Sequence, residues 1–129
     1  MSGHRDRPRV VVLAQDLIWA DRLRRAVEAA GGESTHAKTA PELDRDLICA
    51  DYAIVDMTAR NYDPLLAIKR ATEAGVQVLA VGQHDDVALR KRALAAGARR
   101  VLAYRKLADD GPAVVAAFIG HDLPAATLA

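Results

Sequence analysis

Five short apolar segments alternate with five amphipathic segments, and this alternation limits the fold more than any other feature of the sequence. Apolar runs cover 9–14, which is rich in β-branched residues, and 52–56, 76–81 and 100–104, and a more polar run covers 33–37. Residues at helical spacing follow each run, over 17–30, 39–48, 64–74, 87–96 and 111–119. Such strand–helix–strand succession needs crossover connections, so the sequence predicts an α/β domain whose parallel sheet carries helices on both faces.

The polarity of the second strand indicates its place in the sheet. Residues 33–37 form the least apolar run and suit an edge, whereas the first, third and fourth strands have the composition of central strands. The strand order 2-1-3-4-5 of the flavodoxin-like, doubly wound class satisfies both conditions. We therefore expect one domain over 9–119, a polar N-terminal arm over 1–8 and a C-terminal tail over 120–129.

Composition excludes several classes of protein. The 18 basic and 17 acidic residues nearly cancel, so bulk charge favours neither a nucleic-acid binder nor a membrane-surface protein. Cys49 is the only cysteine, which excludes an intramolecular disulfide and a multi-thiolate metal cluster. The apolar run near the N-terminus is too short for a signal peptide or a membrane span, so we expect a soluble, cytoplasmic protein.

Chemistry in such a sheet is placed where the strands reach their carboxyl ends, and Asp56 ends the third strand. Asp16, His84 and Asp85 follow other strands and are candidate groups of the same crevice. Asp16 could join Asp56 in binding a metal or could cap the first helix, and the acids before residue 87 suit a helix cap more simply than a metal site. No phosphate-binding glycine loop, zinc motif or nucleophile elbow is present, so we expect no enzyme, no metal and no cofactor.

Four segments carry a resemblance to a known family. "RVVVLAQD", "ADYAIVDMT", "VQVLAVGQHDD" and "ALAAGARRVLAY" are similar to the receiver domain of bacterial two-component response regulators, over about residues 8 to 119. The resemblance implies a phosphorelay in which a histidine kinase transfers a phosphoryl group to Asp56. It also implies an acidic pair that holds Mg²⁺, a hydroxyl after the fourth strand and a lysine after the fifth.

Those companion positions fall on Ala14, Gln15, Gly82 and Tyr104, and none of them matches the family. Without the acidic pair, phosphoryl transfer loses its main electrostatic stabilisation, and Mg²⁺ is relevant only if Asp56 is a working acceptor. The ring of Tyr104 could instead fill the crevice. We interpret the chain as a pseudo-receiver that acts through protein–protein interaction. The alternatives are a phosphoacceptor with an unusual site at Asp56 and a flavodoxin-like binder of a small ligand.

In this family the fourth helix, fifth strand and last helix form the usual partner or dimer face. Basic residues gather in the corresponding part of the sequence: Arg90, Lys91, Arg99, Arg100, Arg105 and Lys106. The resemblance thus predicts docking of a protein partner, or self-association, on that face, and the alternative is an ordinary solvated surface. No helix-turn-helix or long basic arm indicates a nucleic acid.

Overall fold

The five predicted strands form one parallel sheet in the computed structural model, which describes residues 7–83 and 85–120. The strands are β1 (Arg9–Leu13), β2 (Glu33–Ala37), β3 (Tyr52–Asp56), β4 (Gln77–Gly82) and β5 (Arg100–Ala103), in the order β2-β1-β3-β4-β5. The predicted order and the edge position of the polar second strand are confirmed. His84 lies outside the described residues, as do nearly all residues of the predicted arm and tail.

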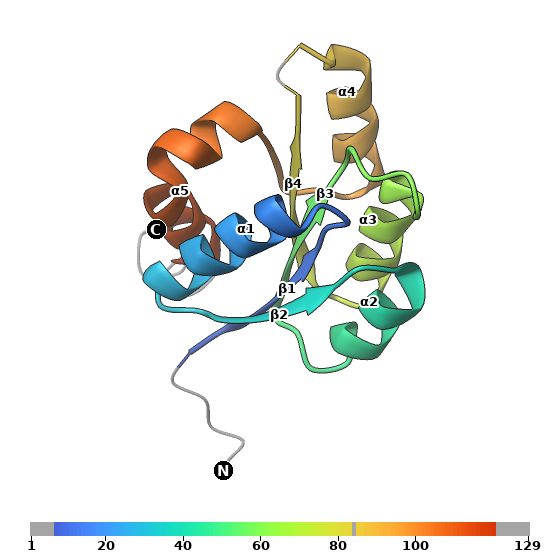
Figure 1. Cartoon of the computed structure of the whole chain (residues 1–129). Coiled ribbons are helices and arrows are strands. Elements are labelled where there is room, and N and C mark those ends of the chain that lie inside the picture. Colours follow the sequence, from blue (N-terminus) through green and yellow to red (C-terminus); the bar gives the residue numbers. More distant parts are fainter. Residues whose placement is uncertain (1–6, 84, 121–129) are drawn as a thin grey trace, which may run out of the picture.

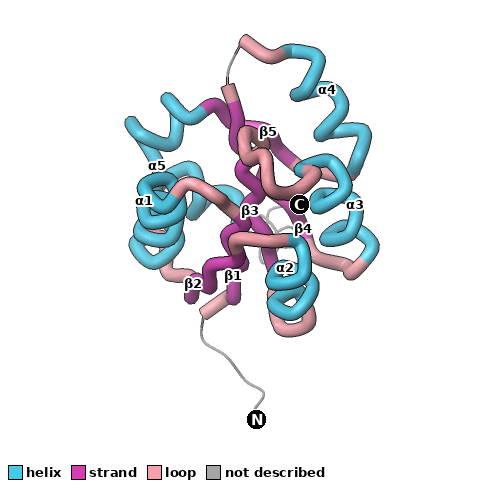
Figure 2. The backbone as a smooth tube through the Cα atoms, turned by 45° about the vertical axis from the view of Figure 1, so that its right-hand side comes forward, coloured by secondary structure: helices cyan, strands magenta, loops and turns pink. Residues whose placement is uncertain are grey.

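Helices cover both faces of the sheet, as Figures 1 and 2 show. One face carries α1 (Leu17–Ala29) and α5 (Tyr104–Gly120), and the other carries α2 (Ala40–Leu47), α3 (Pro64–Glu73) and α4 (Val87–Ala96). Successive strand residues point to opposite faces, so Val10 and Val12 of β1 join the core beneath α1 and α5, whereas Val11 and Leu13 join the other core. Within the described ranges, no helix is both long and apolar enough to cross a membrane.

Side-chain caps explain where the helices begin. Asp16 Oδ1 accepts from the backbone N–H groups of Ile18 and Trp19 at 2.8 and 3.1 Å, and Asp86 Oδ1 accepts from Leu89 at 3.0 Å. These carboxylates satisfy amide groups that have no partner within the helix, and their charge suits its N-terminus. Asp16 and Asp86 therefore act as helix caps: capping was one of the two possibilities given above for Asp16 and the simpler interpretation for the acids before residue 87.

A helical segment that the sequence does not predict precedes the expected last helix. β5 ends at Ala103 and α5 starts at Tyr104, but non-helical backbone at Asp110 (φ −133°, ψ 31°) divides α5 into two helices, and the second corresponds to the predicted helix over 111–119. Pro112 lacks an N–H and crowds the preceding turn, which explains why the helix is interrupted there. Leu107 is buried against the α1 side of the sheet and stabilises the added first part. Tyr104 is thus the first residue of a helix and not the last residue of a strand.

Candidate functional site

Asp56 is the one charged residue that is buried among those the structure describes, with 1% of its surface exposed. It ends the central strand β3, where its backbone pairs with Val81 of β4. Its carbonyl oxygen accepts a 2.5 Å hydrogen bond from the Tyr62 hydroxyl, which also donates to the Leu13 carbonyl at 3.1 Å. Burial of this phenol and the neighbouring Asp56 charge raise the pKa of Tyr62, so it remains a donor that joins the ends of β1 and β3.

Three donors converge on Oδ1 of the Asp56 carboxylate. The Thr58 N–H and hydroxyl lie 3.0 and 2.9 Å away, and the Tyr104 hydroxyl donates to the same atom. The Thr58 and Tyr104 hydroxyl oxygens are themselves 2.6 Å apart. A buried carboxylate is tolerated when hydrogen bonds compensate its lost hydration. The protein's own donors therefore stabilise Asp56.

The ring of Tyr104 is held over this carboxylate by aromatic packing. Its centroid lies 4.3 Å from that of Trp19 in α1, with the planes tilted by 39°, and the Arg22 guanidinium lies 5.2 Å from the Trp19 centroid. Partial burial and the hydrogen bond to Asp56 raise the pKa of the Tyr104 phenol. The phenol therefore stays protonated and donates to Asp56 at neutral pH.

The two positions that correspond to the family's acidic pair, Ala14 and Gln15, carry no side-chain carboxylate that could bind a metal. Ala14 is fully buried, and its carbonyl oxygen lies 2.9 Å from His36 Nε2. Gln15 accepts from the Arg60 N–H at 2.8 Å and so ties the loop after β3 to the end of β1. Asp16 is occupied as the α1 cap.

A shallow pocket of about 330 Å³ at this crevice brings Asp16 and Asp56 together, and Asp85 does not line it. The other residues that line it are Gln15, Thr58, Ala59 and Arg60. Mg²⁺ prefers several carboxylate or water oxygens in octahedral array. Here one carboxylate caps a helix and the other accepts three protein donors on one oxygen, and no group of three His, Cys, Asp or Glu suitable for a metal occurs in the described part of the chain. The residues present do not fit Mg²⁺.

Gly82 offers no hydroxyl after β4, and a neighbouring side chain restricts the space beside it. A Cβ atom added there would lie 3.0 Å from Met57 Cε. Met57 itself is buried and its N–H bonds to the Val81 carbonyl at 2.9 Å. The thioether side chain of Met57 thus lies beside the backbone of β4 at Gly82.

Thr58, Tyr62 and Trp19 are the residues of this site to which the sequence analysis assigned no role. Thr58 stands two positions after Asp56, a spacing at which an Asp side chain often accepts from the backbone, and this signal could have identified it. Tyr62 and Trp19 reach the site from separate elements, so no local spacing marks them.

The six predicted partner-face cations lie on α4, around β5 and at the start of α5. Arg90 donates to the Val101 carbonyl at 3.5 Å, Arg99 donates to Gln77, and Lys106 pairs with Asp110 at 3.0 Å. Most are exposed, and Arg100 is half-buried. The strand β5, which follows α4 and precedes α5, is an edge strand of the sheet (Figure 2).

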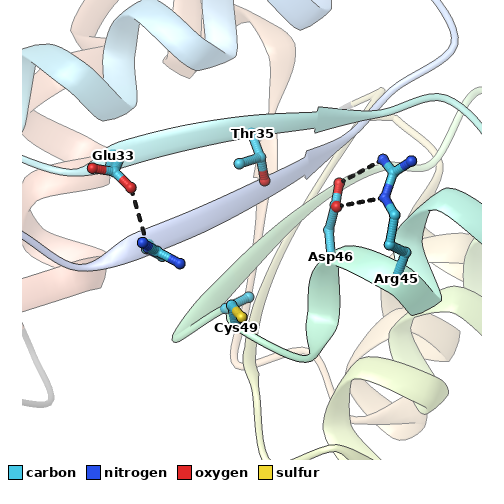
Figure 3. Close-up of a pocket in the computed structure, with 7 residues that line it drawn as sticks. Glu33, Thr35, Arg45, Asp46 and Cys49 are labelled. Atoms are coloured by element: carbon cyan, nitrogen blue, oxygen red, sulfur yellow. Dashed lines mark hydrogen bonds and ion pairs between the residues drawn. The ribbon is translucent and has the colours of Figure 1, made fainter. Parts of the chain in front are cut away.

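A second pocket lies near the other ends of β1 and β2 (Figure 3). Its charged side chains are already paired: Arg9 Nε lies 3.1 Å from Glu33 Oε1, and Arg45 Nε lies 2.9 Å from Asp46 Oδ1. Thr35, Cys49 and Ala50 complete the lining. Because these cations and carboxylates compensate one another, the pocket offers little net charge to an ionic ligand.

No protein-family model matches the sequence, and no curated protein sequence matches it. Solved structures do match. A response regulator from Thermotoga maritima gives a TM-score of 0.67 at 24% identity, over 76% of this chain and 85% of that chain. A CheY-like receiver domain protein from Methanospirillum hungatei JF-1 gives 0.69 at 18%, over 85% and 94%, and a receiver protein from Burkholderia phymatum gives 0.65 at 27%, over 76% and 83%.

These likenesses define the class: the chain has the receiver-domain fold of response regulators. The family resemblance drawn from the sequence is confirmed at the level of the fold.

Proposed function

We propose that this receiver-like domain is a signalling module that acts through protein–protein interaction and without phosphorylation of Asp56. The observation that carries the proposal is the hydrogen bond from Tyr104 to Asp56 Oδ1, in a crevice where Thr58 supplies two further donors to the same oxygen. The groups that compensate the Asp56 charge thus belong to the protein.

Phosphoryl transfer to a carboxylate needs cations or other preorganised positive charge, because the group transferred is strongly anionic. Ala14 and Gln15 provide none, and Tyr104 stands where the resemblance requires a lysine. Asp56 is also only 1% exposed, and one oxygen of its carboxylate is occupied by the hydroxyl of Tyr104, whose ring packs against Trp19. Both the electrostatics and the access therefore oppose transfer.

The test is intact-mass spectrometry after incubation with acetyl phosphate and Mg²⁺. The wild-type chain should gain no phosphoryl group. A restored variant, Ala14→Asp, Gln15→Asp, Gly82→Thr and Tyr104→Lys, should gain one, and the same variant with Asp56→Asn should not.

Circular dichroism on all variants verifies that they are folded. A wild-type mass gain that disappears in Asp56→Asn would establish Asp56 as an acceptor and overturn the proposal. A restored variant that is folded but unmodified would show that the four companion positions do not explain the loss.

A further inference from the structure

Charge is strongly segregated in this nearly neutral chain. Residues 87–108 contain seven lysines and arginines and no aspartate or glutamate, whereas the remaining residues contain eleven basic and seventeen acidic residues. The seven are the six cations already named and Arg92. The overall charge of +1 therefore conceals one basic region on an otherwise acidic molecule.

The fold gathers this region at one edge of the sheet. β5 is the edge strand, α4 packs beside it, and the first turns of α5 follow directly from it (Figure 2). We call this surface, formed by residues 87–108, the basic edge. Eighteen of its 22 residues are at least partly exposed, slightly fewer than the roughly 20–30 residues that one partner contributes to an ordinary protein interface.

Most of its cations lack a compensating carboxylate. Lys106 pairs with Asp110, whereas Lys91, Arg92, Arg100 and Arg105 make no side-chain hydrogen bond or ion pair within the described part of the chain. Uncompensated charges of one sign raise the local potential and attract a surface of the opposite sign. The basic edge is therefore complementary to an acidic partner.

The basic edge also exposes large apolar side chains. Val87 and Leu94 on α4 are 55% and 47% exposed. Seven residues separate them, which is two helical turns, so they lie on one side of α4 with Lys91 between them. Ala93 is the one fully buried residue of this helix, so α4 leaves most of its surface available. The partner should thus combine carboxylates with apolar side chains.

A second copy of the same surface is a poor occupant, because a two-fold contact would place seven cations against seven cations. A nucleic acid fits less well than a protein, because it carries closely and uniformly spaced phosphates. Asp85 and Asp86 stand directly before the basic edge, and Asp109 and Asp110 directly after it, all exposed. A continuous polyanion would meet these carboxylates, and it would leave Val87 and Leu94 without apolar contacts.

We infer that the basic edge docks an acidic, partly apolar surface of a different protein. This inference rests on the proposed function, since it gives the chemistry of the partner in that interaction. The family resemblance implied either a protein partner or self-association on this face. The inference is for a different protein and not for a second copy of the chain.

The test uses the full, isotope-labelled chain and backbone amide NMR at low salt. The probe is a synthetic amphipathic peptide of glutamate and leucine, compared with a peptide in which serine replaces leucine. The glutamate–leucine peptide should perturb amides within 87–108. Arg90→Glu with Lys91→Glu should weaken its binding by about tenfold or more, whereas Lys38→Glu with Lys69→Glu, exposed residues on other elements, should leave it nearly unchanged.

A second pair of variants separates apolar recognition from charge. Val87→Ser with Leu94→Ser should weaken the glutamate–leucine peptide and leave the glutamate–serine peptide unaffected. Perturbation outside 87–108, absence of perturbation, or equal weakening by both charge-reversal pairs would overturn the inference.

Two further measurements address other occupants. Tighter binding of duplex DNA or phosphatidylserine vesicles to the basic edge would assign it to a nucleic acid or a lipid surface instead. A dimer in sedimentation that Arg90→Glu with Lys91→Glu dissociates would assign it to a second copy. None of these results depends on the mass measurement at Asp56, so the docking inference and the absence of phosphorylation fail separately.

Discussion

The hydroxyl of Tyr104 donates a hydrogen bond to Oδ1 of Asp56, and so joins the first residue of α5 to the last residue of β3. The two residues are 48 positions apart, and the bond places the Tyr104 hydroxyl against the carboxylate that ends β3. Trp19 packs against the Tyr104 ring. The start of α5, the start of α1 and the end of β3 are thereby coupled through one phenol.

Tyr104→Phe should destabilise the protein by about 1–3 kcal/mol, because it removes one donor from a buried carboxylate and keeps the ring in place. Urea denaturation monitored by circular dichroism measures this change. In an Asp56→Asn background the same substitution should cost less, with a coupling energy of about 0.5–3 kcal/mol. Equal costs in the two backgrounds would show that the hydrogen bond contributes nothing to stability.

Alkaline pH should weaken the fold through Tyr104 and Tyr62. Folding raises the pKa of both phenols above the ordinary value of 10.0, mainly by burial. The unfolded chain therefore releases these protons first. The stabilisation is fully present below pH 10 and is lost as pH rises toward the folded values, by at most about 1.4 kcal/mol per pH unit for each tyrosine.

Urea titrations across this range should give a steeper fall for wild type than for Tyr104→Phe or Tyr62→Phe. Ultraviolet absorbance of phenolate provides an independent check, since both groups should titrate late in the folded protein. Identical pH slopes for the three proteins would contradict the assignment of these phenols.

The sheet was predictable because four of the five strands are continuous apolar runs and each helix has its own start or stop signal. The polar composition of β2 was sufficient to place it at an edge. The boundary between β5 and α5 was not predictable in the same way, because residues 100–109 suit a strand or a helix locally, and Pro112 suggested that a helix begins near 111. Burial of Leu107 against α1 and the contact of Tyr104 with Asp56 decide it, and both are long-range.

The candidate site was partly predictable. Asp56 and its missing companions follow from position along the chain, and the helix cap at Asp16 follows from its place before α1. The hydrogen bonds that converge on Asp56 were not predictable, except for that of the nearby Thr58, because Tyr104 and Trp19 come from different helices. Strand-end position thus identifies the site, whereas tertiary packing decides whether it is open.

Two glycine positions should respond differently to alanine. Gly97, which follows α4, has a φ of 122°, and an added Cβ would lie 2.8 Å from Thr72 Cγ2. Gly97→Ala combines backbone strain with a clash and should cost about 2 kcal/mol or more. Gly82→Ala brings a Cβ 3.0 Å from the flexible end of Met57, with an ordinary 3.7 Å contact to Met57 Cβ, and should cost less than about 1 kcal/mol. Urea denaturation of both variants checks the order, and the reverse order would contradict the packing beside β4.

Mg²⁺ should leave the thermal stability of the wild-type chain unchanged, because Asp16 and Asp56 are both committed to protein donors. Ala14→Asp with Gln15→Asp should introduce two carboxylates beside Asp56, one at a fully buried position. This variant should be less stable in EDTA, since a buried charge without a partner is costly.

Mg²⁺ should then recover part of that loss by binding the folded state alone, by about 2.7 kcal/mol at one hundred times its dissociation constant. Melting temperatures with Mg²⁺ and with EDTA measure the effect, and adding Asp56→Asn to the double variant should reduce it. If Mg²⁺ stabilises wild type and Asp56→Asn abolishes that gain, Asp56 binds the cation without the acidic pair. That result would contradict the electrostatic argument that the site lacks the positive charge needed for phosphoryl transfer.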